Sequence, residues 1–153
     1  MKLSEIIRED NIVSKLKASD KRGVLEELAT VICVHEPAVE KAALMKVLVD
    51  RERLGSTGIG DGVAIPHGKL NNIAYPIISF GRSKHGLDFD SMDGQLAYLF
   101  FMLIAPENSS GVHLQVLAKI AKILKSSDFR KKLMEADTRG ELYRAIIDTD
   151  DES

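Results

Sequence analysis

The spacing of apolar residues in the first third of the chain predicts two helices. Hydrophobic positions from Val24 to Ile32 recur at intervals of three and four residues, which is the period of an amphipathic helix. Asp20 precedes this pattern as a predicted N-cap, and Pro37 ends it. The same period over residues 39–53 predicts a second helix.

Four shorter apolar stretches predict strands. Residues 11–16 alternate, and residues 63–66 form a short apolar run that Pro66 ends. Longer strands are expected over residues 75–82 and 95–105. The last of these is apolar on both faces, so we expect it to lie in the centre of its sheet.

Three further helices are predicted after residue 105, each marked by a capping residue. Ser109 or Ser110 can cap the first helix, and Asp128 can cap the second. Thr138 can cap the third, with Glu141 three residues later as the partner in a capping box. Interleaved strands and helices indicate the α/β class, and we expect a three-layer α/β/α architecture with a central mixed β-sheet flanked by helices on both faces.

Length and composition support a single domain. The chain has 153 residues, 44% of them hydrophobic, which is enough for one core. We expect one domain over residues 1–148. Residues 149–153 are acidic and lack apolar periodicity, so we expect a frayed, solvated C-terminal tail.

Charge and cysteine content exclude several functional classes. With 21 Lys and Arg against 23 Asp and Glu, the net charge of −2 argues against nucleic acid or an anionic membrane as the main partner. One cysteine, Cys33, forms neither an internal disulfide nor a Cys-rich zinc site. Residues 1–9 do not resemble a signal peptide, and the apolar run 96–105 is too short to span a bilayer. We therefore expect a cytoplasmic protein without membrane insertion.

A glycine-rich segment over residues 55–62 matches neither common phosphate-binding pattern. The Walker pattern fails because five residues, not four, separate Gly62 from Gly68, and Leu70 stands where Ser or Thr would bind magnesium. The dinucleotide pattern fails because Val63 occupies the third glycine position. Taken alone, the glycines indicate only a backbone that turns sharply.

His67 is the first candidate for chemistry, because it follows the strand-ending Pro66. A neutral imidazole at a sheet edge is nucleophilic at pH 7 without a separate base, which suits phosphoryl transfer. Arg51, near the end of the second helix, could bind phosphoryl oxygens through two parallel hydrogen bonds from its guanidinium group. Arginine is also common at a helix C-terminus because its charge complements the helix dipole. His113 falls in a first helical turn, where anions are favoured but where a polar residue is also ordinary and seldom part of the core.

The other histidines carry no recognisable motif. His35 lies at a helix end and His85 in a charged loop, and no pair of histidines has the HExxH spacing. We therefore expect no metal site.

The run Arg51-Glu52-Arg53-Leu54-Gly55-Ser56-Thr57-Gly58-Ile59-Gly60-Asp61-Gly62-Val63-Ala64-Ile65-Pro66-His67-Gly68 carries a family resemblance. It closely resembles the active-site signature of the type 2 enzyme IIA domains (fructose/mannitol class) of the bacterial phosphoenolpyruvate-dependent phosphotransferase system, abbreviated PTS. Within this run, the segment Leu-Gly-Ser-Thr-Gly-Ile-Gly is most similar to the sequences of the nitrogen-regulatory branch of that family.

This resemblance implies a role for each candidate residue. His67 would be phosphorylated on a ring nitrogen by a small phosphocarrier protein of the HPr type. His113 would help to hold the phosphoryl group, and Arg51 would position and neutralise it. Ser56 and Thr57 are placed as weak hydroxyl donors to phosphate. The family needs neither a metal nor an organic cofactor.

The resemblance leaves three functional readings open. The first is a regulatory, nitrogen-type PTS component whose phosphorylation state is read by target proteins. The second is a sugar-transport enzyme IIA that passes phosphate to a separate IIB protein. The third is a binding module that keeps the fold without phosphorylation, which is disfavoured because His67, His113 and Arg51 are all present. Assembly into a homo-oligomer is compatible with each of the three.

Overall fold

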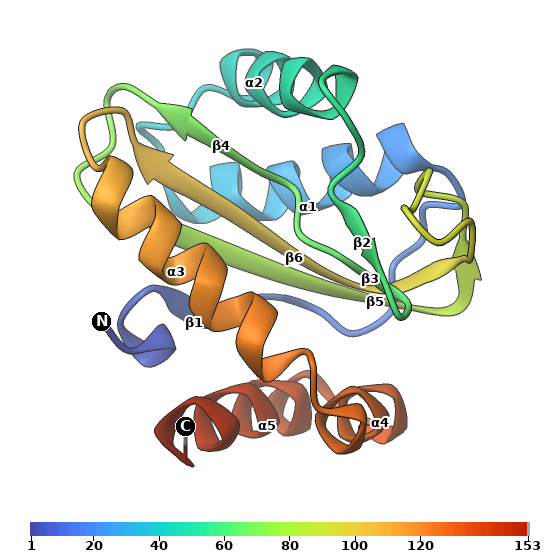
Figure 1. Cartoon of the computed structure of the whole chain (residues 1–153). Coiled ribbons are helices and arrows are strands. Elements are labelled where there is room, and N and C mark those ends of the chain that lie inside the picture. Colours follow the sequence, from blue (N-terminus) through green and yellow to red (C-terminus); the bar gives the residue numbers. More distant parts are fainter. Residues whose placement is uncertain (153) are drawn as a thin grey trace.

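A computed structural model, which describes residues 1–152, shows a single sheet with helices on both faces (Figure 1). After a short 3-10 turn, Leu3–Glu5, the elements follow in the order β1 Ile7–Val13, α1 Lys21–His35, α2 Lys41–Arg53, β2 Gly58–Gly60, β3 Val63–Ala64, β4 His67–Leu70, β5 Ile77–Leu87, β6 Ala97–Pro106, α3 Ser110–Ile123, α4 Ser127–Glu135 and α5 Arg139–Glu152.

Strand β6 is the centre of the sheet, as its apolar sequence predicted. The strand order is β1-β5-β6-β3-β2, and β4 also pairs with β6. β5 runs antiparallel to β6, whereas β3 and β4 run parallel to it along its other side. Because β1 is parallel to β5 and β2 is antiparallel to β3, the sheet is mixed.

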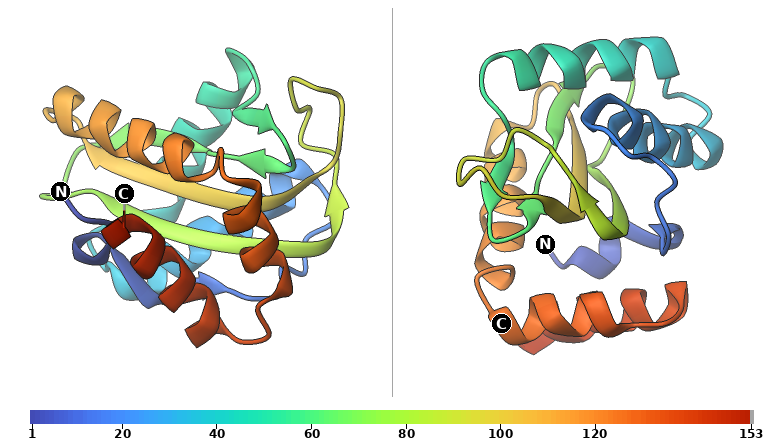
Figure 2. Two further views of the ribbon diagram at one scale, coloured as in Figure 1. Left: turned by 60° about the horizontal axis from the view of Figure 1, so that its bottom comes forward. Right: turned by 90° about the vertical axis from the view of Figure 1, so that its right-hand side faces the viewer.

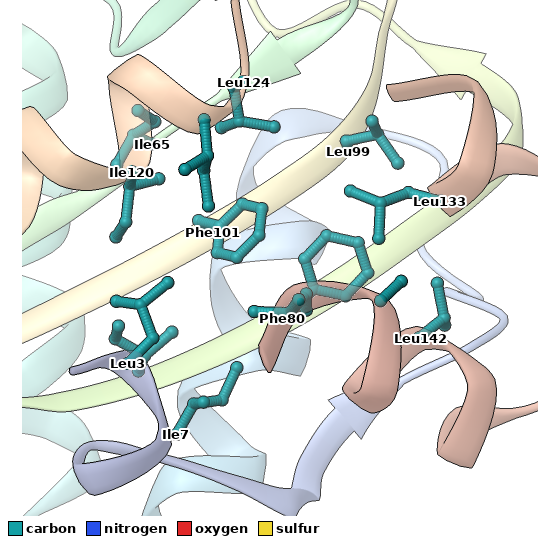
Figure 3. Packing of buried hydrophobic residues seen from close by; sticks show 14 of the residues in the cluster. Leu3, Ile7, Ile65, Phe80, Leu99, Phe101, Ile120, Leu124, Leu133 and Leu142 are labelled. Carbon is teal, nitrogen blue, oxygen red and sulfur yellow. The ribbon is translucent and has the colours of Figure 1, made fainter. Parts of the chain in front are cut away.

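Alternate side chains of β6 pack into two separate hydrophobic clusters, one on each face of the sheet. Phe101 faces a cluster with residues of α3, α4 and α5, and its ring meets Phe80 edge-on at a centroid distance of 4.7 Å (Figure 3). Phe100 and Met102 face the opposite cluster, which α1 and α2 cover. The views in Figure 2 show the sheet between these helices, and the expected three-layer α/β/α fold is confirmed.

Two predicted helix caps form as expected. The Asp20 side chain accepts a hydrogen bond of 2.8 Å from the backbone N–H of Gly23, at the start of α1. At the start of α5, the Thr138 hydroxyl oxygen accepts a bond of 3.1 Å from the N–H of Glu141. The Glu141 carboxylate accepts in return from the N–H of Asp137, one residue earlier than in a standard capping box.

The predicted cap of the second C-terminal helix is wrong. Helix α4 begins two residues earlier, and Ser126 caps it by accepting from the N–H of Phe129 at 3.2 Å. Asp128 lies instead within the first turn, where its charge still complements the helix dipole. Ser109 does occupy the N-cap position of α3, but its hydroxyl donates to the carbonyl of Pro106 at 2.7 Å.

Two strand predictions also need correction. The first strand covers Ile7–Val13 and not residues 11–16, because the parallel pairing with β5 selects Ile7 and Ile12 as partners of Ile78 and Phe80. Strand β4 was not predicted. Pro66 lacks an N–H and interrupts the ladder, but its carbonyl accepts from Leu103 at 2.9 Å, and the chain resumes pairing with β6 at once.

The expected frayed tail is wrong over residues 149–152, while Ser153 lies outside the described residues. Helix α5 continues to Glu152, and Asp150 is only 5% exposed. The Asp150 carboxylate accepts a hydrogen bond of 2.7 Å from the N–H of Leu3 and lies 3.2 Å from the ammonium group of Lys119. This acidic segment therefore joins the two ends of the described chain.

Candidate active site

His67 begins the edge strand β4, which pairs with β6. Gly68 follows it, and a side chain at that position would collide with Val47 of α2, so the glycine allows the helix to lie close to the strand. The Nδ1 atom of His67 lies 2.7 Å from the carbonyl oxygen of Ile65. A carbonyl only accepts, so Nδ1 carries the proton, and in the neutral ring the lone pair is on Nε2.

The structure brings His113 against His67. The two rings are 5.4 Å apart between centroids and tilted by 58°. His113 lies in the first turn of α3, as predicted, but it is only 6% exposed, which differs from the expectation that a polar residue at this position is seldom part of the core. Its Nδ1 atom is buried without a hydrogen-bond partner among the described residues.

Both histidines favour the neutral form. Burial lowers the pKa of His113 to about 4, with further lowering by the charges of His67 and Lys69. Burial also lowers the pKa of His67, while the hydrogen bond to Ile65 opposes this change. Of the nearby charges, Arg51 lowers the pKa of His67 further and Glu52 raises it. A neutral His67 has a nucleophilic Nε2 at pH 7.

Arg51 supplies a positive charge beside this pair. It lies in the last turn of α2, and its Nη1 atom donates a hydrogen bond of 2.9 Å to the carbonyl of Gly55 in the glycine-rich segment. The guanidinium therefore lies over the loop, as the sequence suggested, and close enough to act on the pKa of His67. This hydrogen bond uses one N–H donor of the guanidinium group, so its other N–H donors can bind an anion.

The hydroxyl groups of Ser56 and Thr57 are directed into the protein and not toward an anion. The Thr57 hydroxyl donates to the Glu52 carboxylate in a very short hydrogen bond. The Ser56 hydroxyl donates to the carbonyl of Phe89 at 2.7 Å and accepts from the N–H of Gly58 at 3.0 Å. Both hydroxyl protons are committed to protein acceptors, so the geometry favours a loop-shaping role and not the expected donation to phosphate.

The glycine-rich segment folds into a tight hairpin that supports the site. A tight turn joins strands β2 and β3. Gly60 at the end of β2 and Gly62 in the turn have φ values of 98° and 78°, which strongly favour glycine. The Ile65 carbonyl that binds His67 comes directly after this hairpin, and the Ile65 N–H bonds to the carbonyl of Thr57 at 3.0 Å. The glycines thus fix the backbone that orients the His67 ring.

Sequence reasoning missed two residues of this site, Glu52 and Lys69. The Glu52 side chain is 6% exposed, accepts from the N–H of Thr57 at 3.1 Å and pairs with Lys21 at 3.0 Å. Lys69 donates a hydrogen bond of 2.9 Å to the hydroxyl of Ser110 at the start of α3. Recognising β4 as a strand would have identified Lys69, because residues at i and i+2 share one face.

The remaining polar candidates lie apart from this arrangement. His35 bonds to the carbonyl of Val31 at 3.1 Å on its own helix. Cys33 is half-buried among apolar residues, and burial raises the pKa of its thiol, so it is not activated. In residues 1–152 we find neither a group of three or more His, Cys, Asp or Glu side chains that could hold a metal ion nor a helix long and apolar enough to cross a membrane.

Comparison with curated proteins finds relatives of two kinds. It is 37% identical over 148 residues to the "PTS system fructose-specific EIIABC component" of Bacillus subtilis, but spans only 23% of that protein's length. It is 38% identical over 146 residues to the "Nitrogen regulatory protein" of Bradyrhizobium diazoefficiens, with 95% of both chains covered. The similarity to the first protein is therefore to one part of a larger chain.

Solved structures show the same fold. The crystal structure of nitrogen regulatory protein IIA-Ntr from Neisseria meningitidis matches with a TM-score of 0.88 and 33% identity, covering 94% of this chain and 98% of that one. The IIA mannitol structure from Escherichia coli matches with a TM-score of 0.76 at 22% identity, covering 91% and 97% of the two chains, which shows the fold alone. The family model described as phosphoenolpyruvate-dependent sugar phosphotransferase system, EIIA 2, matches residues 5–149, and the chain therefore belongs to this family.

Proposed function

We propose that this protein is a cytoplasmic phosphohistidine carrier that accepts a phosphoryl group on Nε2 of His67 from an HPr-like phosphocarrier protein. The observation that carries the proposal is the 2.7 Å bond from Nδ1 of His67 to the Ile65 carbonyl, which leaves the lone pair on Nε2. The adjoining His113 ring and the Arg51 guanidinium support it, because both can interact with phosphoryl oxygens.

The transfer needs no metal or organic cofactor. The Nε2 lone pair of His67 forms the new N–P bond, while the N–P bond to the carrier's histidine breaks and its electron pair returns to that ring. The Nδ1 proton of His67 stays in place, bonded to Ile65. In the loose transition state the charge of the phosphoryl group is spread over its three equatorial oxygens, so the Arg51 guanidinium contributes by positioning these oxygens and by electrostatic stabilisation.

Two large, exposed apolar side chains beside the site support a protein as the phosphoryl donor. Leu54 follows the helix turn of Arg51 and is 85% exposed, and Leu114 follows His113 and is 64% exposed. Exposed apolar side chains around a reactive group are typical of transient protein contacts.

Among the uses of such a carrier, we propose the regulatory one, in which target proteins read the phosphorylation state. The relatives named nitrogen regulatory proteins in Bradyrhizobium diazoefficiens and Pseudomonas aeruginosa are covered over 95% and 96% of their length, so they resemble this chain in length as well as in sequence. A second candidate is a sugar-transport enzyme IIA that passes phosphate to a separate IIB protein. The 37% identity to a fructose-specific component favours it.

A phosphorylation assay tests the proposal. Purified protein is incubated with phosphoenolpyruvate, enzyme I and an HPr-type carrier, and its intact mass is measured. We expect one acid-labile, base-stable phosphoryl group in the parent and none in His67→Ala. His35→Ala is the matched control and should still be labelled. An unlabelled parent would overturn the proposal and favour a binding module without phosphorylation.

A second measurement separates the two carrier roles. The phosphorylated protein is mixed with a fructose-type IIB protein, and loss of the label is followed. Regulation predicts transfer no faster than spontaneous hydrolysis, whereas rapid transfer to IIB would favour sugar uptake.

A further inference from the structure

Strand geometry places Lys69 beside His67. In β4 the residues at positions 67 and 69 are half-buried, whereas Gly68 and Leu70 between and after them are buried. Alternate residues of a strand share a face, so the side chains of His67 and Lys69 leave β4 on the same side.

A hydrogen bond to α3 fixes where the Lys69 ammonium group lies. Its Nζ atom donates to the hydroxyl of Ser110 at 2.9 Å. Ser110 and His113 are three residues apart on α3, so they are neighbours on one helix face. The His113 ring is 5.4 Å from that of His67, and the charge of Lys69 is felt at His113, where it lowers the pKa.

The positive charge of Lys69 is not neutralised in the unphosphorylated protein. Among the described residues no carboxylate lies within 4.0 Å of its Nζ atom, and its partner Ser110 is uncharged. An ammonium group has three N–H donors, of which Ser110 takes one. A phosphoryl group adds about −1.5 to −2 of charge, by analogy with other phosphorylated side chains, which is more than the single charge of Arg51 can balance.

We propose that Lys69 is a third functional group of the phosphoryl site, held at the start of α3 by Ser110, and that its ammonium group binds a phosphoryl oxygen once His67 is phosphorylated. This proposal rests on the proposed function. In this role Lys69 exchanges no proton. It acts by charge and hydrogen bonding on the phosphoryl group during transfer and in the phosphorylated protein.

Three variants separate this role from a merely structural tie to α3. Lys69→Met removes the charge, Lys69→Arg keeps it, and Ser110→Ala removes the hydroxyl partner but leaves the charge. We expect Lys69→Met to slow phosphoryl acceptance in single-turnover assays at least tenfold and to shorten the lifetime of the phosphohistidine. Lys69→Arg should stay within about threefold of the parent, as should the exposed control Lys84→Met. Ser110→Ala should be impaired less than Lys69→Met, because the positive charge remains.

A readout that needs no phosphorylation accompanies these rates. NMR titration of the unphosphorylated protein should show the pKa of His113 rising in Lys69→Met and not in Lys84→Met. If the parent accepts no phosphoryl group, the proposed function fails and this inference fails with it. If the parent is labelled but Lys69→Met matches its rate and lifetime, or if Ser110→Ala is impaired as much as Lys69→Met, only the role of Lys69 is overturned.

Discussion

The Nδ1 atom of His67 lies 2.7 Å from the carbonyl oxygen of Ile65, two residues earlier in the chain. This short local bond selects the ring nitrogen that can react. Ile65 is itself held by the backbone of Thr57, so the tautomer of the candidate nucleophile depends on the hairpin that the glycine-rich segment forms. The family signature is therefore explained by backbone geometry as well as by side-chain chemistry.

The lowered pKa values of the two histidines predict how activity changes with pH. Because burial lowers the pKa of His67 below its ordinary value of 6.5, the neutral nucleophile persists into mildly acidic solution. Single-turnover phosphoryl acceptance should be flat above pH 7 and should decline only below pH 6.5. A rate that already falls between pH 8 and pH 7 would contradict this assignment.

The pKa of His113 also predicts a loss of stability in acid. Its pKa is about 4 in the folded protein and near 6.5 when unfolded, so below pH 6.5 the unfolded chain binds the proton more tightly. The stability that neutral His113 contributes is complete above pH 6.5 and is lost as the pH falls toward 4. We expect this loss to reach about 1 to 3 kcal/mol.

Urea unfolding at pH 7 and pH 4.5 measures this effect, with His113→Asn as the comparison. Carboxylates titrate in both proteins, so the parent and the variant share that part of the loss between pH 7 and pH 4.5. The difference between their two losses of unfolding free energy is therefore the contribution of His113. Equal losses in the parent and in His113→Asn would show that His113 makes no such contribution.

Arg51 should matter for the rate of transfer and little for the fold. We expect Arg51→Ala to slow phosphoryl acceptance about 10- to 100-fold, because about 1.4 to 2.7 kcal/mol of transition-state stabilisation is removed. Arg53→Ala is a matched control on the same helix turn, since Arg53 is exposed and forms a salt bridge with Asp50. Equal rates for the two variants, measured in single turnovers, would remove Arg51 from the site.

Arg82 is expected to hold the C-terminal helices onto the sheet. Its side chain is fully buried, and it donates to the carbonyl of Ser14 at 3.1 Å, to that of Leu133 at 2.9 Å and, through a very short bond, to that of Ala136. Arg82→Met leaves these carbonyls without partners and should lower the free energy of unfolding by about 2 to 4 kcal/mol.

Arg8→Met provides the comparison for Arg82→Met, because the Arg8 side chain is 56% exposed. Urea unfolding should place it within about 0.5 kcal/mol of the parent. A similar small change in Arg82→Met would show that the buried guanidinium does not stabilise the end of α4.

Asp150 should stabilise the contact between the two ends of the chain. Asp150→Asn weakens the acceptor for Leu3 and removes the charge that Lys119 approaches, so we expect a loss of about 1 to 2 kcal/mol in unfolding free energy. Asp148→Asn changes an exposed carboxylate on the same helix and should have little effect. If both variants unfold at the same urea concentration, this contact contributes nothing measurable.

The sequence was sufficient for those features that local pattern determines. Helix α1 follows from the spacing of its apolar residues and from Asp20, whose side chain acts within three residues of its own position. The central position of β6 follows from its apolar run. Such a strand has apolar side chains on both faces, and both are buried only where the sheet is covered on each side. The predicted closeness of His67 and His113 depended on the family resemblance, because no local rule joins β4 to α3.

Features determined by distant contacts were not predictable in this way. Strand β4 forms because the backbone of β6 is available for pairing with residues 67–70. A local rule ends the strand at Pro66 and does not anticipate this pairing. The acidic C-terminal segment was expected to be solvated. Asp150 contacts Leu3 and Lys119 only because α5 packs against the rest of the folded chain. His113 is buried for a similar reason, since its burial comes from the position of α3 and not from its own sequence neighbours.

The most direct test of the account is the position of the phosphoryl group on the protein. The ¹⁵N-histidine-labelled protein is phosphorylated through the HPr-type carrier, and the ring nitrogens are assigned by ¹⁵N and ³¹P NMR. We predict a single phosphohistidine at His67 with phosphorus on Nε2 and the proton retained on Nδ1. Phosphorus on Nδ1, or on any residue other than His67, would contradict the central claim.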